Sequence, residues 1–323
     1  MRLDDLAHVP VPLFASAMGW GGLAMAWRKA HEALGSPVWI GEAAALTAAA
    51  VFALVCGLYA WKTAHHWEET VKEFRHPVRI NFFAAISINL MIMGGLALPY
   101  AAELADALWM AGAALHLALA LYVIGRWIEH PHDPATFNPA WYIPVVGNVL
   151  APVVGVKLGH ADAAWFFFAV GIVFWLGLLP LALNRAIFVA PPLPPKMLPT
   201  LAIFIAPPAV GFLAWRALTA PSMSFPVDPL GHVLIFAALF TALLVLRLIT
   251  VLARVPFAPS WWAYTFPSAA LAAGLAELAA AKGGSAFFAL LAGAFVVGAT
   301  AVVVLVSIRT VKAAFSGQLF VPE

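Results

Sequence analysis

Histidine is the residue type in this chain best suited to bind a metal ion or to carry a proton. Five of the ten histidines, His65, His66, His76, His130 and His132, fall in polar segments between apolar stretches, where solvation accounts for them. His116 stands alone midway along an apolar stretch. Without a second ligand at its depth, His116 is predicted to be a hydrogen-bonded packing residue rather than a haem ligand or a proton relay.

The other reactive residue types also argue against an enzyme. Cys56 is the only cysteine, so the chain forms neither an internal disulfide nor a thiolate metal cluster. The sequence contains no G-x-S-x-G, H-E-x-x-H, Walker A or glycine-rich dinucleotide motif. We therefore expect no catalytic residues, no metal ion and no cofactor.

Charged residues avoid the centres of the apolar stretches. Those nearest to them lie close to the stretch ends, at Glu42, Glu103, Asp106, Lys157, Arg247 and Glu277. Long side chains at such positions can reach the polar interface of a membrane. Proton-coupled pumps and carriers usually need an ionisable relay inside the membrane, and His116 is the only candidate that the sequence offers.

The composition defines the broad class of protein. Of 323 residues, 64% are hydrophobic and only 10% are charged, with a mean hydropathy of +0.94. Soluble domains carry about 25% charged residues, so this chain has too few charges to cover a water-soluble globule. A soluble enzyme, a nucleic-acid binder and a disordered protein are excluded. The net charge of +2 gives no reason to expect a polyanionic partner.

Ten apolar segments are long enough to cross a hydrocarbon core of about 30 Å. They cover residues 12–30, 39–62, 80–99, 103–125, 140–158, 163–187, 197–218, 229–253, 260–281 and 285–309. The prediction is an all-α integral membrane protein with a single transmembrane domain over 1–323. Lys and Arg are more frequent at the termini and in the loops on the same side, which predicts cytoplasmic N- and C-termini. The largest basic loop, Ala64 to Arg79, is predicted to contain an interfacial helix that stops at Pro77.

Proline is concentrated in the odd-numbered predicted helices. Pro144 and Pro152 interrupt the fifth, Pro207 and Pro208 the seventh, and Pro267 the ninth. Each proline removes a backbone hydrogen bond, which membrane proteins tolerate beside a neighbouring helix or a water-filled cavity. The odd helices are therefore predicted to line a central path, with the even helices outside them, as five helical hairpins around an axis.

Several short strings of residues resemble one family in its own order. They are FASAMGWGGLAMAW from Phe14, HPVRINFF from His76, PAWYIP from Pro139, WWAYTFP from Trp261 and SGQLF from Ser316. The chain thereby resembles, over nearly its full length, the tellurite-resistance and C4-dicarboxylate transporter family, which includes the guard-cell slow anion channels of plants. The resemblance implies a bacterial inner-membrane protein, a homotrimer with one pore in each subunit, and small inorganic or organic anions as its partners.

The resemblance also implies a gate. A phenylalanine on the ninth helix plugs the pore in this family, and the WWAYTFP string places Phe266 at that position. Because positions i and i+4 share a helix face, we predict a set of further lining residues. They are Phe14 and Met18 from the first helix, Phe82 or Phe83 from the third, Asn148 from the fifth and Ala270 from the ninth.

The function predicted from these features is an anion channel gated by a phenylalanine. One alternative is a secondary carrier or exporter of a C4-dicarboxylate, sulfite or tellurite-related anion, in which Asn148 would be the best candidate for a substrate contact. Another is a membrane enzyme or haem electron carrier, which would need paired ligands that the sequence lacks.

Overall fold

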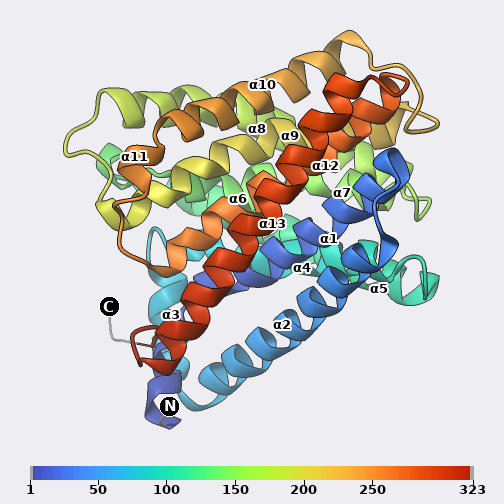
Figure 1. Ribbon diagram of the computed structural model, residues 1–323. Helices are drawn as coiled ribbons and strands as arrows, with labels where there is room; N and C mark the ends of the chain where they lie inside the picture. Colours follow the sequence, from blue (N-terminus) through green and yellow to red (C-terminus); the bar gives the residue numbers. More distant parts are fainter. Residues whose placement is uncertain (1–2, 321–323) are drawn as a thin grey trace.

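The computed structural model describes residues 3–320, and within that range the chain forms helices and no β-strand (Figure 1). The α-helices are α1 (Phe14–Leu34), α2 (Val38–His65), α3 (Trp67–Arg75), α4 (Ile80–Ala97), α5 (Ala102–Glu129), α6 (Ile143–Val146), α7 (Ala151–Gly155), α8 (Ala161–Ile187), α9 (Ala206–Thr219), α10 (Pro229–Arg247), α11 (Ile249–Leu252), α12 (Thr265–Ala281) and α13 (Ala286–Phe315). The 3₁₀ helices are η1 (Leu3–His8), η2 (Val11–Leu13), η3 (Pro134–Thr136), η4 (Pro139–Tyr142), η5 (Gly147–Leu150), η6 (Pro195–Ile205) and η7 (Pro259–Tyr264). The predicted helix in the basic loop is confirmed as α3.

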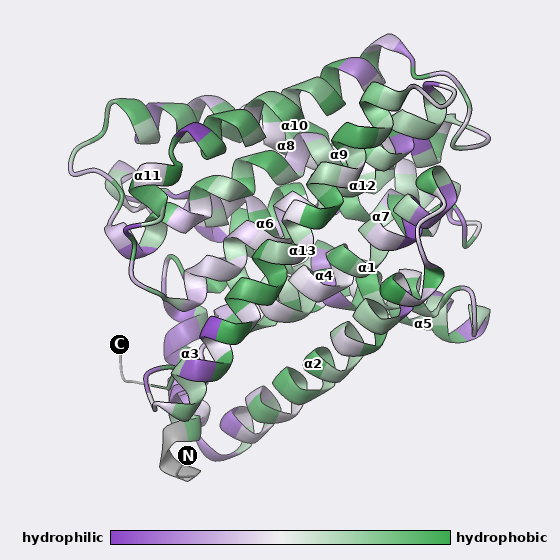
Figure 2. Cartoon of the chain, viewed as in Figure 1, coloured by the Kyte–Doolittle hydropathy of each residue, from purple (hydrophilic) through white to green (hydrophobic). Residues whose placement is uncertain are grey.

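Seven helical stretches among residues 3–320 are long and apolar enough to cross a membrane. They are α2, α4, α5, α8, α10, α13 and the continuous stretch Pro195–Thr219 formed by η6 and α9. In Figure 2 these helices are mostly hydrophobic along their length, and the hydrophilic residues gather at their ends and in the loops. The three other predicted segments, 12–30, 140–158 and 260–281, also form helices, but these are shorter or less apolar.

Prolines explain why some predicted helices are interrupted. Segment 140–158 is a series of short α and 3₁₀ turns, with Pro144 in α6 and Pro152 in α7. A proline has no backbone N–H and its ring crowds the preceding turn, so it can bend or break a regular α-helix. For the same reason, η6 precedes α9 at Pro207 and Pro208, and η7 precedes α12.

Burial separates the helices into an inner and an outer layer. In the apolar windows, 78% of the residues of α4 and 72% of those of Pro195–Thr219 are buried, against 28% for α2, α8, α10 and α13 and 33% for α5. Most residues of α1, α6, α7 and α12 are buried as well. The interior therefore consists of α1, α4, α6–α7, η6–α9 and η7–α12. Each packs against the outer helix that follows it in the chain.

Glycines allow the inner helices α1 and α12 to lie unusually close together. A Cβ atom on Gly19 would lie 2.4 Å from Thr265 Oγ1, and one on Gly22 would lie 2.9 Å from Phe266 Cδ2. Real Cβ atoms do not approach other atoms so closely, so any larger residue would force the two helices or their side chains apart. The GWGG string of the sequence thus forms the face that receives α12.

The outer helix α13 is hydrogen-bonded to this pair of helices through indole groups. Tryptophan Nε1 atoms of α1 and η7 donate to hydroxyl oxygens of α13, in the pairs Trp20–Ser307 at 3.1 Å, Trp27–Thr300 at 3.0 Å and Trp262–Thr310 at 3.0 Å. Figure 1 shows α13 crossing obliquely over this part of the molecule. The three bonds fix α13 along the length of α1 and at the start of α12.

A buried ion pair organises the end of the molecule at which both termini lie (Figure 1). Lys62 Nζ on α2 lies 2.6 Å from Glu73 Oε2 on α3, and the two residues are only 2% and 4% exposed. Tyr59 donates a hydrogen bond to the same carboxylate, and Lys62 donates to the carbonyl oxygen of Val9. Because every charge here is paired, the N-terminal segment is tied to α2 and α3.

Candidate functional site

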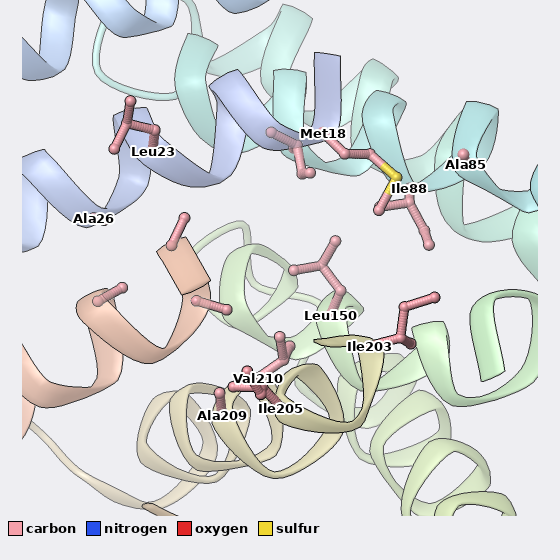
Figure 3. Close-up of a cluster of buried hydrophobic side chains, with 14 of the residues drawn as sticks. Met18, Leu23, Ala26, Ala85, Ile88, Leu150, Ile203, Ile205, Ala209 and Val210 are labelled. Carbon is pink, nitrogen blue, oxygen red and sulfur yellow. The ribbon is translucent and has the colours of Figure 1, made fainter. Parts of the chain in front are cut away.

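A small cavity of about 90 Å³ lies at the centre of the inner layer. Each of the five inner segments contributes to its wall, and the outer helices contribute none. The wall is almost wholly apolar and includes Ala15, Met18, Phe82, Ile88, Tyr142, Val146, Leu150, Ile203, Val210 and Phe266. Figure 3 shows Met18, Ile88, Leu150 and Ile203 reaching toward one another across this space.

The ring of Phe266 borders this cavity at its contact with α1. Phe266 is the second residue of α12 and is only partly buried, because one side of its ring faces the cavity. Its Cδ2 atom lies against Gly22, where a side chain would have no room. The ring thus fills the space between α1 and α12 on one side of the cavity.

A larger cavity of about 470 Å³ opens at the end of the molecule opposite the termini. The basic residues of its wall are Arg28, Lys29, Lys157 and Arg216, and its acidic residues are Glu32 and Glu277. Glu277 of α12 accepts a hydrogen bond from Lys29 at 2.6 Å and one from Arg216 at 3.3 Å. Lys157 has no hydrogen bond or ion pair to any described residue. We call this cavity the outer vestibule, and its lining carries an excess of positive charge.

A third cavity, of about 590 Å³, opens at the end that carries the termini. Its ionisable lining residues are His8, Lys62, Arg79 and Lys196, with Glu69 and Glu73. Pro259 belongs to the wall of this cavity and also to that of the central one. We call this cavity the inner mouth.

Three of the residues predicted from the sequence line the central cavity, namely Met18, Phe82 and Phe266. Phe14 and Phe83 lie outside its lining. Phe14 packs against Tyr59 of α2, with ring centroids 5.6 Å apart, and Phe83 packs edge-on against the same ring at 6.0 Å. Both rings therefore face α2 rather than the cavity.

Asn148 and Ala270 are also buried outside the cavity lining. Asn148 is fully buried, and its Nδ2 atom donates a 2.6 Å hydrogen bond to the carbonyl oxygen of Val145. This bond satisfies a carbonyl in the irregular α6–η5 stretch, and the buried Oδ1 atom of Asn148 has no partner among the described residues. Ala270 lies within the core beside Ala269, which faces Gly22 together with Phe266.

His116 is fully buried on α5, where its Nδ1 atom shares a 2.8 Å hydrogen bond with Ser87 Oγ. Its Nε2 atom has no partner among the described residues and points at Gly147, where an added Cβ would lie 3.0 Å away. His116 therefore packs α5 against α4 and η5, as expected of a hydrogen-bonded core residue.

Residues that the sequence reasoning missed include Ala15, Ile88 and Val210. The cavity face of α1 runs through Ala15, Met18 and Gly22, with spacings of three and four residues. The sequence prediction began this face at Phe14, one residue before Ala15. Where an alanine and an aromatic adjoin at a helix start, spacing alone does not show which one faces inward.

The fold and these cavities define the class of the protein: a helical membrane protein whose interior holds an apolar cavity between two basic openings. The chain belongs to the SLAC1 voltage-dependent anion channel family, whose pattern matches residues 8–311. Its relatives include plant S-type anion channels and a bacterial tellurite resistance protein homolog, as the resemblance of the sequence strings predicted.

Three relatives illustrate the similarity. The S-type anion channel SLAH3 of Arabidopsis thaliana is 28% identical over 81% of this chain and 42% of its own length. The guard cell S-type anion channel SLAC1 of the same plant is 26% identical over 98% of this chain and 58% of its own length. The tellurite resistance protein TehA homolog of Haemophilus influenzae is 24% identical over 84% of this chain and 82% of its own. The chain thus spans about half the length of these plant relatives.

Proposed function

We propose that the chain is a channel for small anions, closed by the ring of Phe266. The observation that carries this proposal is the contact between Phe266 and Gly22, which lies between the central cavity and the outer vestibule. Displacing the ring toward one side would join the two spaces. The path would then run from the outer vestibule through the central cavity to the inner mouth.

The order of residues along each inner segment supports such a path. On α1, Met18 lines the central cavity and Met25 lines the vestibule, with Gly22 between them. On α9, Val210 lines the central cavity and Leu213 lines the vestibule. All five inner segments contribute to both cavities, so we infer one continuous axis surrounded by ten helical segments that pair as five hairpins.

The charges suit an anion. Basic residues outnumber acidic ones at both openings, which raises the local anion concentration. The apolar central wall offers no cation that would bind an anion tightly, so an entering anion can leave again. Selectivity among anions then follows the cost of dehydration.

A secondary carrier is the second candidate function. Carriers bind substrate at helices that are broken near mid-membrane, and the α6–η5–α7 stretch is broken in this way. In that case, the substrate class would be a C4-dicarboxylate, sulfite or a tellurite-related anion. Saturable uptake that depends on a proton gradient would identify such a carrier.

We further propose that residues 1–323 form a single transmembrane domain that assembles as a homotrimer in a bacterial inner membrane, with both termini in the cytoplasm. Figure 1 places both termini at one end, which favours their lying on the same side of the membrane. Cysteines introduced singly at His8 and Gly317, with Cys56 replaced by serine, should label from the cytoplasmic side. Labelling from opposite sides would contradict the topology, and a native mass of a monomer or dimer would contradict the trimer.

The gate is tested by Phe266→Ala in planar bilayers. Replacing a fully packed core phenylalanine by alanine costs about 3–5 kcal/mol of stability. Phe266 already borders a cavity, so its replacement should cost less. The variant should fold and carry a steady anion current that the wild type lacks. The control is Phe240→Ala, which removes an equal ring from the outer surface of α10, where Phe240 is 69% exposed. Normal yield of Phe266→Ala without current would contradict the channel.

A further inference from the structure

An apolar groove of about 510 Å³ runs along the outside of the molecule between α10–α11 and α13. Its rim residues Leu246, Ile249 and Leu305 are about half exposed, at 53%, 54% and 47%. Among its lining residues, only Trp261, Tyr264 and Ser268 carry a polar side-chain atom. Because its walls are membrane-crossing helices, the groove opens toward lipid rather than water.

The floor of the groove is the back of α12. Ser268 and Leu271 line the groove, whereas Phe266 of the same helix faces the central cavity. Successive residues of an α-helix are about 100° apart, so Ser268 and Phe266 point to opposite sides of α12. Whatever fills the groove therefore supports the helix that carries Phe266.

Three arginines follow the groove toward the C-terminal ends of α10 and α13. Arg247 and Arg254 directly follow the lining residues Leu246 and Ala253 on one wall, and Arg309 lies one turn beyond Leu305 on the other. All three are exposed, and none forms a hydrogen bond or ion pair with a residue in 3–320. The groove thus combines an apolar trough with unpaired positive charge at one end.

Two buried polar atoms of the groove residues also lack partners. Trp261 Nε1 and Tyr264 Oη are covered from solvent and bond to no described residue. Buried polar groups without a partner are uncommon in folded proteins. Both belong to η7, toward the same end of the groove as the cations.

We propose that this groove binds a phospholipid with an anionic headgroup. An acyl chain occupies the trough, and the phosphate lies among Arg247, Arg254 and Arg309. The ester oxygens lie near Trp261 and Tyr264 and supply acceptors after a small rotation of these rings. Basic pockets between transmembrane helices on the cytoplasmic side bind anionic lipid headgroups in this way. The site is separate from the anion path and does not depend on it.

The test is native mass spectrometry of delipidated full-length protein titrated with phosphatidylglycerol or with phosphatidylcholine of the same acyl chains. We expect at least about tenfold tighter binding of phosphatidylglycerol, equivalent to about 1.4 kcal/mol. Replacing Arg247, Arg254 and Arg309 together by glutamine should abolish that preference. Arg75→Gln changes an exposed cation of α3 that does not line the groove, and it should leave the preference unchanged.

The trough is tested by Gly298→Phe. Gly298 lines the groove and has no atom within 4 Å of an added Cβ, so a side chain can begin there and extend into the trough. Gly293→Phe is the matched control, because Gly293 lies on the same helix with equal space but outside the lining. Gly298→Phe should lose the bound lipid and Gly293→Phe should retain it, with both variants folded by circular dichroism.

Three results would overturn the proposal: equal binding of the two lipids, unchanged lipid binding by Gly298→Phe, or equal loss in both glycine variants. If Gly298→Phe instead broke the oligomer while lipid binding stayed the same, the groove would seat a second copy of the chain.

Discussion

Replacing Gly22 by alanine measures the contact on which the proposed gate rests. The new methyl would lie 2.9 Å from Phe266 Cδ2 and 3.3 Å from the Ala269 Cβ atom. Carbon atoms in contact sit about 3.5–4.0 Å apart, so the Phe266 ring must retreat by at least about 0.6 Å. Overpacking of this size destabilises a core by about 1–3 kcal/mol.

Most of the cost should disappear once the ring is gone, because only the 3.3 Å contact with the Ala269 Cβ atom then remains. In a double-mutant cycle, Gly22→Ala in the Phe266→Ala background has room for its methyl, so the two changes should couple by about 1–3 kcal/mol. The free energy of unfolding in mixed micelles, followed by circular dichroism, provides the measurement. In a parallel current recording, Gly22→Ala alone should change the anion current through the channel with Phe266 in place, because the added methyl displaces the Phe266 ring.

The matched control is the neighbouring glycine. A Cβ atom on Gly21 would lie 2.5 Å from Ile92 Cγ2, so Gly21→Ala is also crowded but does not touch Phe266. The changes in unfolding free energy caused by Gly21→Ala and by Phe266→Ala should therefore add in the double variant to within about 0.5 kcal/mol. The proposed contact would be refuted if Gly22→Ala and Phe266→Ala were also additive in unfolding free energy. It would be refuted as well if both glycine variants coupled equally to Phe266→Ala.

Three further predictions follow from the buried pair, the vestibule and the packing of α5. Lys62→Ala leaves Glu73 buried without its partner and should cost about 3–5 kcal/mol in unfolding free energy, whereas Lys72→Ala breaks an exposed pair and should leave the unfolding free energy nearly unchanged. Lys157→Gln removes an unpaired vestibule cation and should lower anion current through the opened channel at low salt, with the difference shrinking at high salt. Gly147→Val places side-chain atoms against His116 and should lower thermal stability, an effect that His116→Ala should partly relieve.

The sequence predicted the membrane class and the location of the helices because both depend on long apolar runs. It predicted one helix for residues 140–158, where the structure has short α and 3₁₀ turns around Pro144 and Pro152. Mean hydropathy does not distinguish an α-helix from a 3₁₀ helix of the same residues. The prolines marked where regular helix would fail, but not which geometry would replace it.

The candidate site was less predictable than the fold. Phe266 was selected from 23 phenylalanines only through the WWAYTFP resemblance, and no feature of its local sequence distinguishes it from a packing ring. The Lys62–Glu73 pair was missed because its partners lie on two helices separated by a turn at His66. Such contacts depend on how α2 and α3 meet, which the spacing along the chain does not determine.

The outer helices are longer than the membrane requires. At about 1.5 Å per residue, the 28 residues of α2 and the 30 of α13 extend about 42 and 45 Å, against a hydrocarbon core of about 30 Å. Excess length is accommodated by tilting, and α2 and α13 run obliquely to α10 in Figure 1. A change in bilayer thickness should therefore change the tilt of α13. The hydroxyl groups of α13 accept hydrogen bonds from tryptophans of α1 and η7, and η7 leads directly into α12. A change in the tilt of α13 would thus displace α1 and α12, between which the Phe266 ring lies, so the protein would respond to membrane thickness.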